Sequence, residues 1–113
     1  MDYTERLRRL AINDAHFAEE GAGGARAEPR ELDPKTLALV RLAALVAVGG
    51  AVPSYGAHAD AAVTAGATAA EIVDVLVGVI PIIGLPSVVA TAPKLAMALG
   101  YDTDDAFEHQ SDG

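Results

Sequence analysis

The N-terminal segment carries apolar side chains at the spacing of one helix face: Tyr3, Leu7, Leu10 and Phe17. Charged residues such as Arg8 and Arg9 lie between them. This pattern predicts an amphipathic helix over residues 3–20. The glycine-rich residues 21–25 that follow predict a flexible break.

The next helix is predicted from its end signals. Asp33 and Pro34 predict its start, because an aspartate can accept hydrogen bonds from the free N–H groups of a first turn and proline fits the first helical position. Apolar residues then continue to Val48 almost without interruption, which predicts a central helix. The glycine pair that begins at Gly49 predicts its end.

Three further helices are predicted in the second half of the chain. Pro53 begins one that runs to about residue 65. Thr68 and Glu71 match a capping box, in which each side chain bonds the other residue's backbone N–H, and they open a helix that ends at Gly84. The last predicted helix runs from residue 86 to residue 99.

No segment alternates between apolar and polar positions with the period of two that a half-buried strand requires. The predicted fold class is therefore all-α, a small bundle of about five helices. The predicted organisation is an N-terminal helix and flexible linker over residues 1–30, a helical domain over residues 31–100 and an acidic disordered tail over residues 101–113.

Residues 75–93 contain no charged side chain over 19 positions, which is near the length of a membrane-spanning helix. Three prolines and two glycines interrupt this run. The sequence therefore predicts two buried helices joined at Gly84 rather than one membrane span.

The apolar content and the net charge of the chain indicate which partners it can bind. Hydrophobic residues make up 51% of the chain but aromatic residues only 4%, so much of the apolar mass is in small side chains. A chain this small cannot easily hide so much apolar surface alone, and we expect it to form a homo-oligomer. The net charge of −8 argues against nucleic acid and against an anionic membrane surface, and it is compatible with a cytoplasmic protein. The charged N-terminus shows no signal peptide.

Several short motifs follow one another in a set order: residues 32–36 (LDPKT), residues 39–43 (LVRLA), His58, residues 62–68 (AVTAGAT) with residues 71–73 (EIV), and residues 84–86 (GLP). Over about residues 30–98, this order and spacing resemble the carboxymuconolactone decarboxylase-like family. The resemblance implies an all-α, alkylhydroperoxidase D-like fold that assembles as a trimer or hexamer. One branch of the family decarboxylates 4-carboxymuconolactone in aromatic catabolism. The other reduces disulfides with a CxxC pair, a nearby glutamate and a histidine.

The chain departs from the redox branch of that family. The family pattern CxxCxxxH places Ala51 and Ser54 at the two thiol positions and His58 at the histidine position. The glutamate expected about twelve residues before the first cysteine falls on Ala38 or Leu39. The chain contains no cysteine, so it has neither an attacking nor a resolving thiol. Peroxidase or disulfide reductase activity is therefore disfavoured.

The motif retains polar groups that suit acid–base chemistry. Ser54, Tyr55 and His58 lie three and four positions apart, so on a helix they share one side. In decarboxylation of a lactone acid, negative charge develops on the carbon that loses the carboxylate, and an acid must then supply a proton. Histidine titrates near neutral pH, so His58 is the candidate acid/base. Ser54 or Tyr55 would hold the substrate carboxylate, and Arg41 would pair with an anionic substrate.

Each candidate residue also has a structural interpretation. His58 could be a hydrogen-bonded structural residue, Ser54 a helix cap, and Tyr55 a packing residue at a subunit contact. Arg41 could pair with a carboxylate of the same chain: Asp60, Glu71 or Asp74. The three histidines lack metal-ligand spacing, and no phosphate-binding loop is present, so neither a metal nor a cofactor is predicted.

Two functional hypotheses remain open. In the first, the chain is a cofactor-free decarboxylase, or a related acid–base enzyme, that acts on a small carboxylated lactone with His58 and Ser54 as catalytic residues and Tyr55 and Arg41 as substrate-binding residues. In the second, the chain keeps the oligomeric fold but has lost its chemistry, and it serves as a non-catalytic binding or assembly module.

Overall fold

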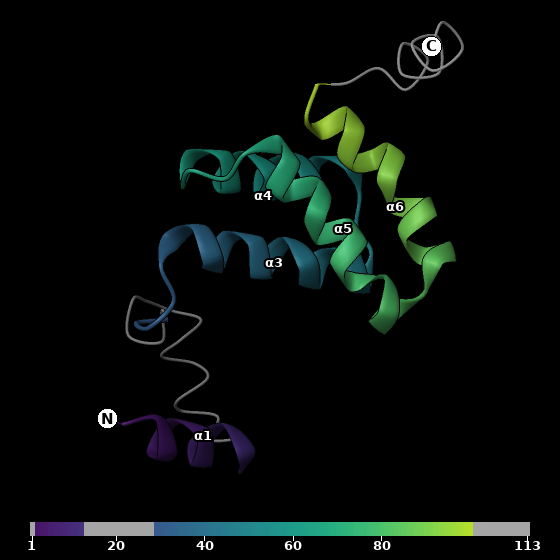
Figure 1. Ribbon diagram of the computed structural model, residues 1–113. Coiled ribbons are helices and arrows are strands. Elements are labelled where there is room, and N and C mark those ends of the chain that lie inside the picture. The colour runs from purple at the N-terminus through teal and green to yellow at the C-terminus, as the bar shows by residue number, and fades with distance from the viewer. Residues whose placement is uncertain (1, 13–28, 101–113) are drawn as a thin grey trace, which may run out of the picture. The chain divides into compact units, whose positions relative to one another are not determined.

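The computed structural model describes residues 2–12 and 29–100, and within these ranges it contains five α-helices and no strand. The predicted all-α class is confirmed. The chain divides into one unit that ends at Glu31 and a second that begins at Leu32. Figure 1 shows α1 in the first unit and α3 to α6 in the second. The predicted flexible break (21–25) and the predicted disordered tail (101–113) lie outside the described residues.

In the first unit, α1 (Tyr3–Ala11) is organised around one carboxylate. The guanidinium groups of Arg8 and Arg9 donate hydrogen bonds to the Glu5 carboxylate at 2.9 and 3.2 Å. These bonds hold the pKa of Glu5 at about 2. The pairs are local to the helix surface and help to set its charged side.

The end of α1 corrects one prediction. The helix ends at Ala11, earlier than the predicted end at residue 20, and Ile12 takes the C-capping position, where its backbone N–H donates to the carbonyl of Arg8. Asn13 and Asp14 follow in the sequence, and these residue types favour caps and turns over helix interiors. Residues 13–20 lie outside the described part of the chain.

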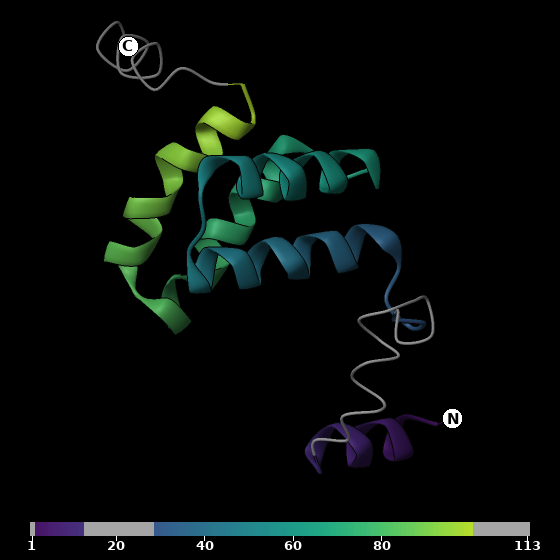
Figure 2. The ribbon, with the colours of Figure 1, turned by 180° about the vertical axis from the view of Figure 1, so that it is seen from behind.

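The second unit contains four helices: α3 (Pro34–Val48), α4 (Val52–Thr64), α5 (Ala69–Ile83) and α6 (Leu85–Ala98). α3 packs against α4 and α5, and both of these helices pack against α6. Figures 1 and 2 show α3 and α4 side by side, with α5 across them and α6 at one end. The predicted helix bounds in this unit are confirmed to within one residue.

The predicted caps of α3 are present. The Asp33 carboxylate accepts a hydrogen bond from the backbone N–H of Thr36 at 2.7 Å, and this bond lowers the pKa of Asp33 below its usual value. At the other end Gly49 has φ of +84°, a left-handed conformation that glycine adopts without steric cost. These two signals fix where α3 begins and ends.

The capping box that opens α5 is confirmed on both sides. The Glu71 carboxylate accepts from the backbone N–H of Thr68 at 2.9 Å, and the Thr68 hydroxyl accepts from the backbone N–H of Glu71 at 3.1 Å. α5 continues past Pro81 and ends before Gly84. Among the described residues, no helix is both long enough and apolar enough to cross a membrane.

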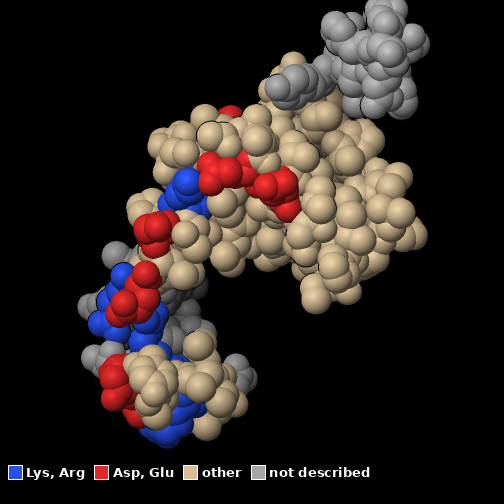
Figure 3. All heavy atoms as spheres, in the orientation of Figure 1, with Lys and Arg blue, Asp and Glu red and all other residues tan. Residues whose placement is uncertain are grey.

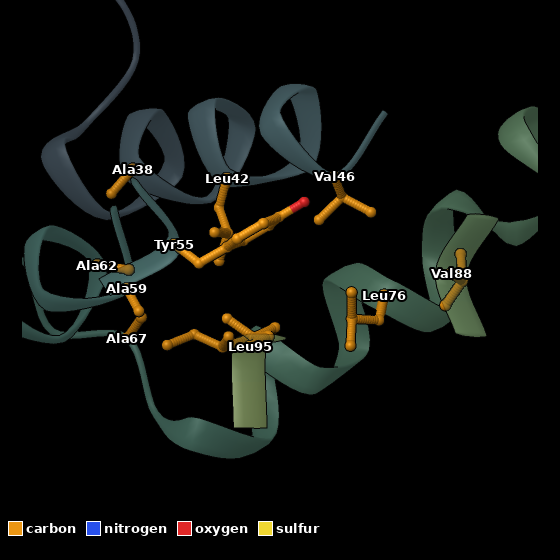
Figure 4. Packing of buried hydrophobic residues seen from close by; sticks show 11 residues of the cluster. Ala38, Leu42, Val46, Tyr55, Ala59, Ala62, Ala67, Leu76, Val88 and Leu95 are labelled. Carbon is orange, nitrogen blue, oxygen red and sulfur yellow. The ribbon is translucent and has the colours of Figure 1, made fainter. Parts of the chain in front are cut away.

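The core of the second unit is built mainly from small and branched side chains. Figure 4 shows the ring of Tyr55 between Leu42 of α3 and Leu95 of α6. These three side chains are almost completely buried, and so is Ile72 of α5. Alanines fill the space between the helices, which allows the backbones of α3 and α4 to approach each other closely.

Candidate functional site

A groove lies between α3 and α4, with a volume of about 370 Å³. Figure 2 shows the two helices that form it side by side. Its lining comes from one side of each helix and from the residue that caps α4: Pro34, Leu37, Ala38 and Arg41 on α3, and Ala57, His58, Ala61 and Ala65 on or just after α4. The groove is therefore a small, mostly apolar site with two polar side chains, Arg41 and His58.

Helix periodicity explains which residues line the groove. On α3, Leu37 and Arg41 are one turn apart and flank the buried Ala38. On α4, His58 and Ala61 follow one another along the same side. The alanines leave space where larger side chains would fill the gap between the two helices.

His58 and Arg41 bring different chemistry to the same groove. His58 is half-buried and Arg41 is exposed. An imidazole can donate or accept a proton, and a guanidinium can bind a carboxylate through two parallel hydrogen bonds. The arrangement suits a small organic acid whose apolar body lies against the alanines and whose carboxylate meets the guanidinium.

The structure places Tyr55 away from the groove. Its side chain is completely buried in the core, where the hydroxyl lies 3.5 Å from both the Leu45 carbonyl oxygen and the Thr91 hydroxyl oxygen. Tyr55 and His58 are three residues apart, which turns them about 60° from each other around the helix. That rotation is enough to bring Tyr55 into the core while His58 faces the groove.

Ser54 lies on the exposed surface of α4, one turn before His58, and it does not line the groove. Its alternative interpretation as the helix cap is wrong. α4 already begins at Val52, its capping position is Ala51, and no side chain makes a capping hydrogen bond there. The helix starts one residue earlier than the sequence predicted, and Ser54 falls inside its first turn after Pro53.

An ion pair joins the starts of α3 and α5. Lys35 Nζ lies 2.8 Å from Glu71 Oε2. The pairing raises the pKa of Lys35 and lowers the pKa of Glu71, which is lowered further by the backbone N–H of Thr68. Glu71 therefore acts both as a helix cap and as an ion-pair partner, and both of its carboxylate oxygens are engaged.

The sequence analysis did not identify the apolar lining of the groove. Leu37 and Ala61 each lie one turn from a candidate residue, Arg41 and His58 respectively. That spacing was visible in the sequence, but it does not show that α3 and α4 would lie side by side with these sides opposed. In residues 2–12 and 29–100, no three histidine, aspartate or glutamate side chains are grouped so as to hold a metal ion.

The fold and the groove define an all-α protein with a small, mostly apolar groove that holds Arg41 and His58 between two helices. The model of the Carboxymuconolactone decarboxylase family matches residues 15–96. The chain therefore belongs to this family, as its motifs predicted. No curated protein matches the chain, and no solved structure matches it.

Proposed function

We propose that the groove between α3 and α4 binds a small carboxylated lactone or a related organic acid, and that the protein decarboxylates it without a cofactor. The observation that carries this proposal is the presence of His58 and Arg41 in one groove whose other walls are apolar. Membership of the Carboxymuconolactone decarboxylase family supports the reaction class.

In the proposed reaction, Arg41 binds and orients the substrate, and the alanine-rich wall excludes water from its body. The bond between the ring carbon and the carboxylate breaks, and carbon dioxide leaves. The electron pair stays on the carbon and spreads into the conjugated lactone. The protonated imidazole of His58 then donates a proton to that carbon, which completes the product.

The remaining candidates have smaller parts in this proposal. Tyr55 lies in the core and Ser54 lies outside the groove lining, so neither is needed to hold the substrate. Only Arg41 and His58 remain as polar side chains of the groove lining. This small number also favours the alternative, a non-catalytic module that binds a small acid in the same groove. The decarboxylase and the non-catalytic module would both bind the acid, but only the decarboxylase would convert it.

The test measures turnover and binding separately. Carboxylated muconolactones are incubated with the full chain, and release of carbon dioxide is followed together with affinity by calorimetry. We expect His58→Ala to lower turnover by about 10²–10⁴-fold with little change in affinity, because general acid catalysis contributes on that scale. Arg41→Gln should weaken binding by about ten-fold, as expected for one hydrogen-bonded charge.

Matched controls locate the effect in the groove. Arg6→Gln removes the same charge from α1, and Ala47→Leu enlarges an exposed alanine of α3 outside the groove. Both should behave as the wild type, whereas Ala61→Leu should block binding because it fills the groove. Binding without turnover would establish the non-catalytic alternative. Full turnover in His58→Ala would sink the proposed role of the histidine.

A further inference from the structure

The groove between α3 and α4 has two chemically different ends. Residues 49–51 alone join the two helices, so α3 and α4 run antiparallel, as Figure 2 shows. Arg41 lies eight residues before this connection and His58 seven residues after it, so they line the groove at about the same level. Pro34 and Ala65 lie fifteen residues before it and fourteen after it, and they line the groove at the opposite end.

We call these the polar end and the apolar end of the groove. They are seven residues apart on each helix, which corresponds to about 10 Å because an α-helix rises about 1.5 Å per residue. Leu37 and Ala61 line the groove between the two ends. A ligand that lies along the groove therefore meets a guanidinium and an imidazole at one end and hydrocarbon side chains over the rest of its length.

The residues next to the apolar end do not add a cation to it. Asp33 and Lys35 flank Pro34 in the sequence. Asp33 is itself a carboxylate, and the ammonium of Lys35 lies 2.8 Å from Glu71 Oε2. Figure 3 shows basic side chains of the second unit bordered by acidic ones on the face that it displays. A carboxylate placed at the apolar end would therefore lose its water without gaining an ionic partner, which costs free energy.

We infer that the groove selects acids whose carboxylate lies at one end of an apolar body about 10 Å long, and that it rejects acids with a carboxylate at both ends. Ala65 determines this specificity, because its methyl group gives the apolar end room for a hydrocarbon group and brings no charge to it. The inference rests on the proposed function of the groove, and it narrows the substrate class to carboxylated lactones or related acids whose far end is uncharged.

The first experiment compares the affinities of simple acids for the full chain by calorimetry. Butyrate, hexanoate, octanoate and decanoate differ only in length, and an extended octanoate has about the length of the groove. We expect each added methylene up to octanoate to lower the dissociation constant by about two- to four-fold, as burial of a methylene does, whereas decanoate gains nothing further. Suberate is octanoate with a carboxylate at each end, and it should bind about ten-fold more weakly than octanoate, or weaker still.

The second experiment changes the apolar end. Ala65→Leu shortens the groove, so octanoate should bind no more tightly than hexanoate, while the affinity for butyrate stays unchanged. Ala65→Lys supplies a cation there, so suberate should now bind more tightly than octanoate. Thr64 is the matched control, because it is exposed, directly precedes Ala65 and does not line the groove. Thr64→Leu and Thr64→Lys should keep the wild-type order of affinities, and circular dichroism checks that all four variants keep their helix content.

Octanoate that does not bind, equal affinities for octanoate and suberate, or the same response in the Ala65 and Thr64 variants would overturn the inference. Release of carbon dioxide from carboxylated muconolactones tests the proposed function separately. Turnover without a preference for octanoate over suberate would leave the proposed function intact and remove this specificity. The preference without turnover would contradict decarboxylation and support the specificity.

Discussion

The α3–α4 pair and the α5–α6 pair are built from helices of similar length but expose different kinds of side chain. α3 and α4 meet along small side chains and leave a groove that holds Arg41 and His58. After Asp74, α5 has no charged residue, and Lys94 is the charge of α6. The first pair therefore places two polar side chains in a groove, and the second exposes apolar side chains such as Val77, Ile82 and Val89.

The polar groove residues and the exposed apolar residues Val77, Ile82 and Val89 therefore lie on different helix pairs of the second unit. The two pairs share one core, in which α3 and α6 both contact Tyr55 (Figure 4). Changes in the core should therefore affect both pairs together. Changes in the groove lining should affect the first pair and spare the second.

The largest expected effect comes from breaking the shared core. Leu42 of α3 and Leu95 of α6 are 0% and 1% exposed. Leu42→Ala and Leu95→Ala should each lower the free energy of unfolding by about 2–5 kcal/mol, because each leaves a cavity that the surroundings only partly fill. Urea unfolding followed by circular dichroism measures both variants at one protein concentration.

A control variant tests whether the lost free energy of unfolding comes from the cavity in the core. Leu10 of α1 is 62% exposed, and Leu10→Ala should change the free energy of unfolding by less than about 0.5 kcal/mol. Two separate transitions in the Leu95→Ala variant would show that α6 is an independent unit and would contradict the single shared core.

A smaller effect is expected at the start of α5, where Thr68 and Glu71 form a capping box. Thr68→Ala removes the hydroxyl that accepts from the backbone N–H of Glu71, and it should cost about 1 kcal/mol of unfolding free energy. Ser54→Ala is the matched control at the start of α4, because Ser54 makes no capping hydrogen bond there. An equal loss in both variants would show that the capping hydrogen bond is not the cause.

The fold of the second unit was predictable because its end signals are local. Asp33, Thr68 and Gly49 each act on residues one turn away, so the sequence alone indicates where the helices start and stop. α1 was predicted too long because its apolar spacing continues past Ile12, whereas the last turn closes there. Periodicity gives the side that a helix buries, but it does not fix a helix end.

The candidate site was predicted only in part, for a geometric reason. His58 and Arg41 were both expected as site residues. They share a groove only because α3 and α4 lie side by side, and local sequence motifs do not predict that packing. Tyr55 was expected beside His58 because the two are three positions apart. The sequence cannot show which of two adjacent helix sides becomes buried until the neighbouring helices are placed.

The smallest expected effect is the pH dependence of the ion pair between Lys35 and Glu71. The pKa of Glu71 is lowered from its ordinary value of 4.5, so its stabilisation is present above that value and is lost as the pH falls through the lowered pKa. The pKa of Lys35 is raised from 10.5, so its stabilisation is present below that value and is lost as the pH rises through the raised pKa. Both side chains are partly exposed, so the effect should be small and should weaken in salt.

Glu71→Gln isolates the charge from the cap, because glutamine also completes a capping box. Thermal unfolding of the wild type and of this variant is measured from pH 3 to pH 11 at low and at high salt. We expect the two curves to differ most between the two pKa values and to converge at both acid and alkaline pH. Curves that coincide across the whole range would mean that Glu71 stabilises α5 through its cap alone, and that the ion pair to α3 contributes nothing measurable.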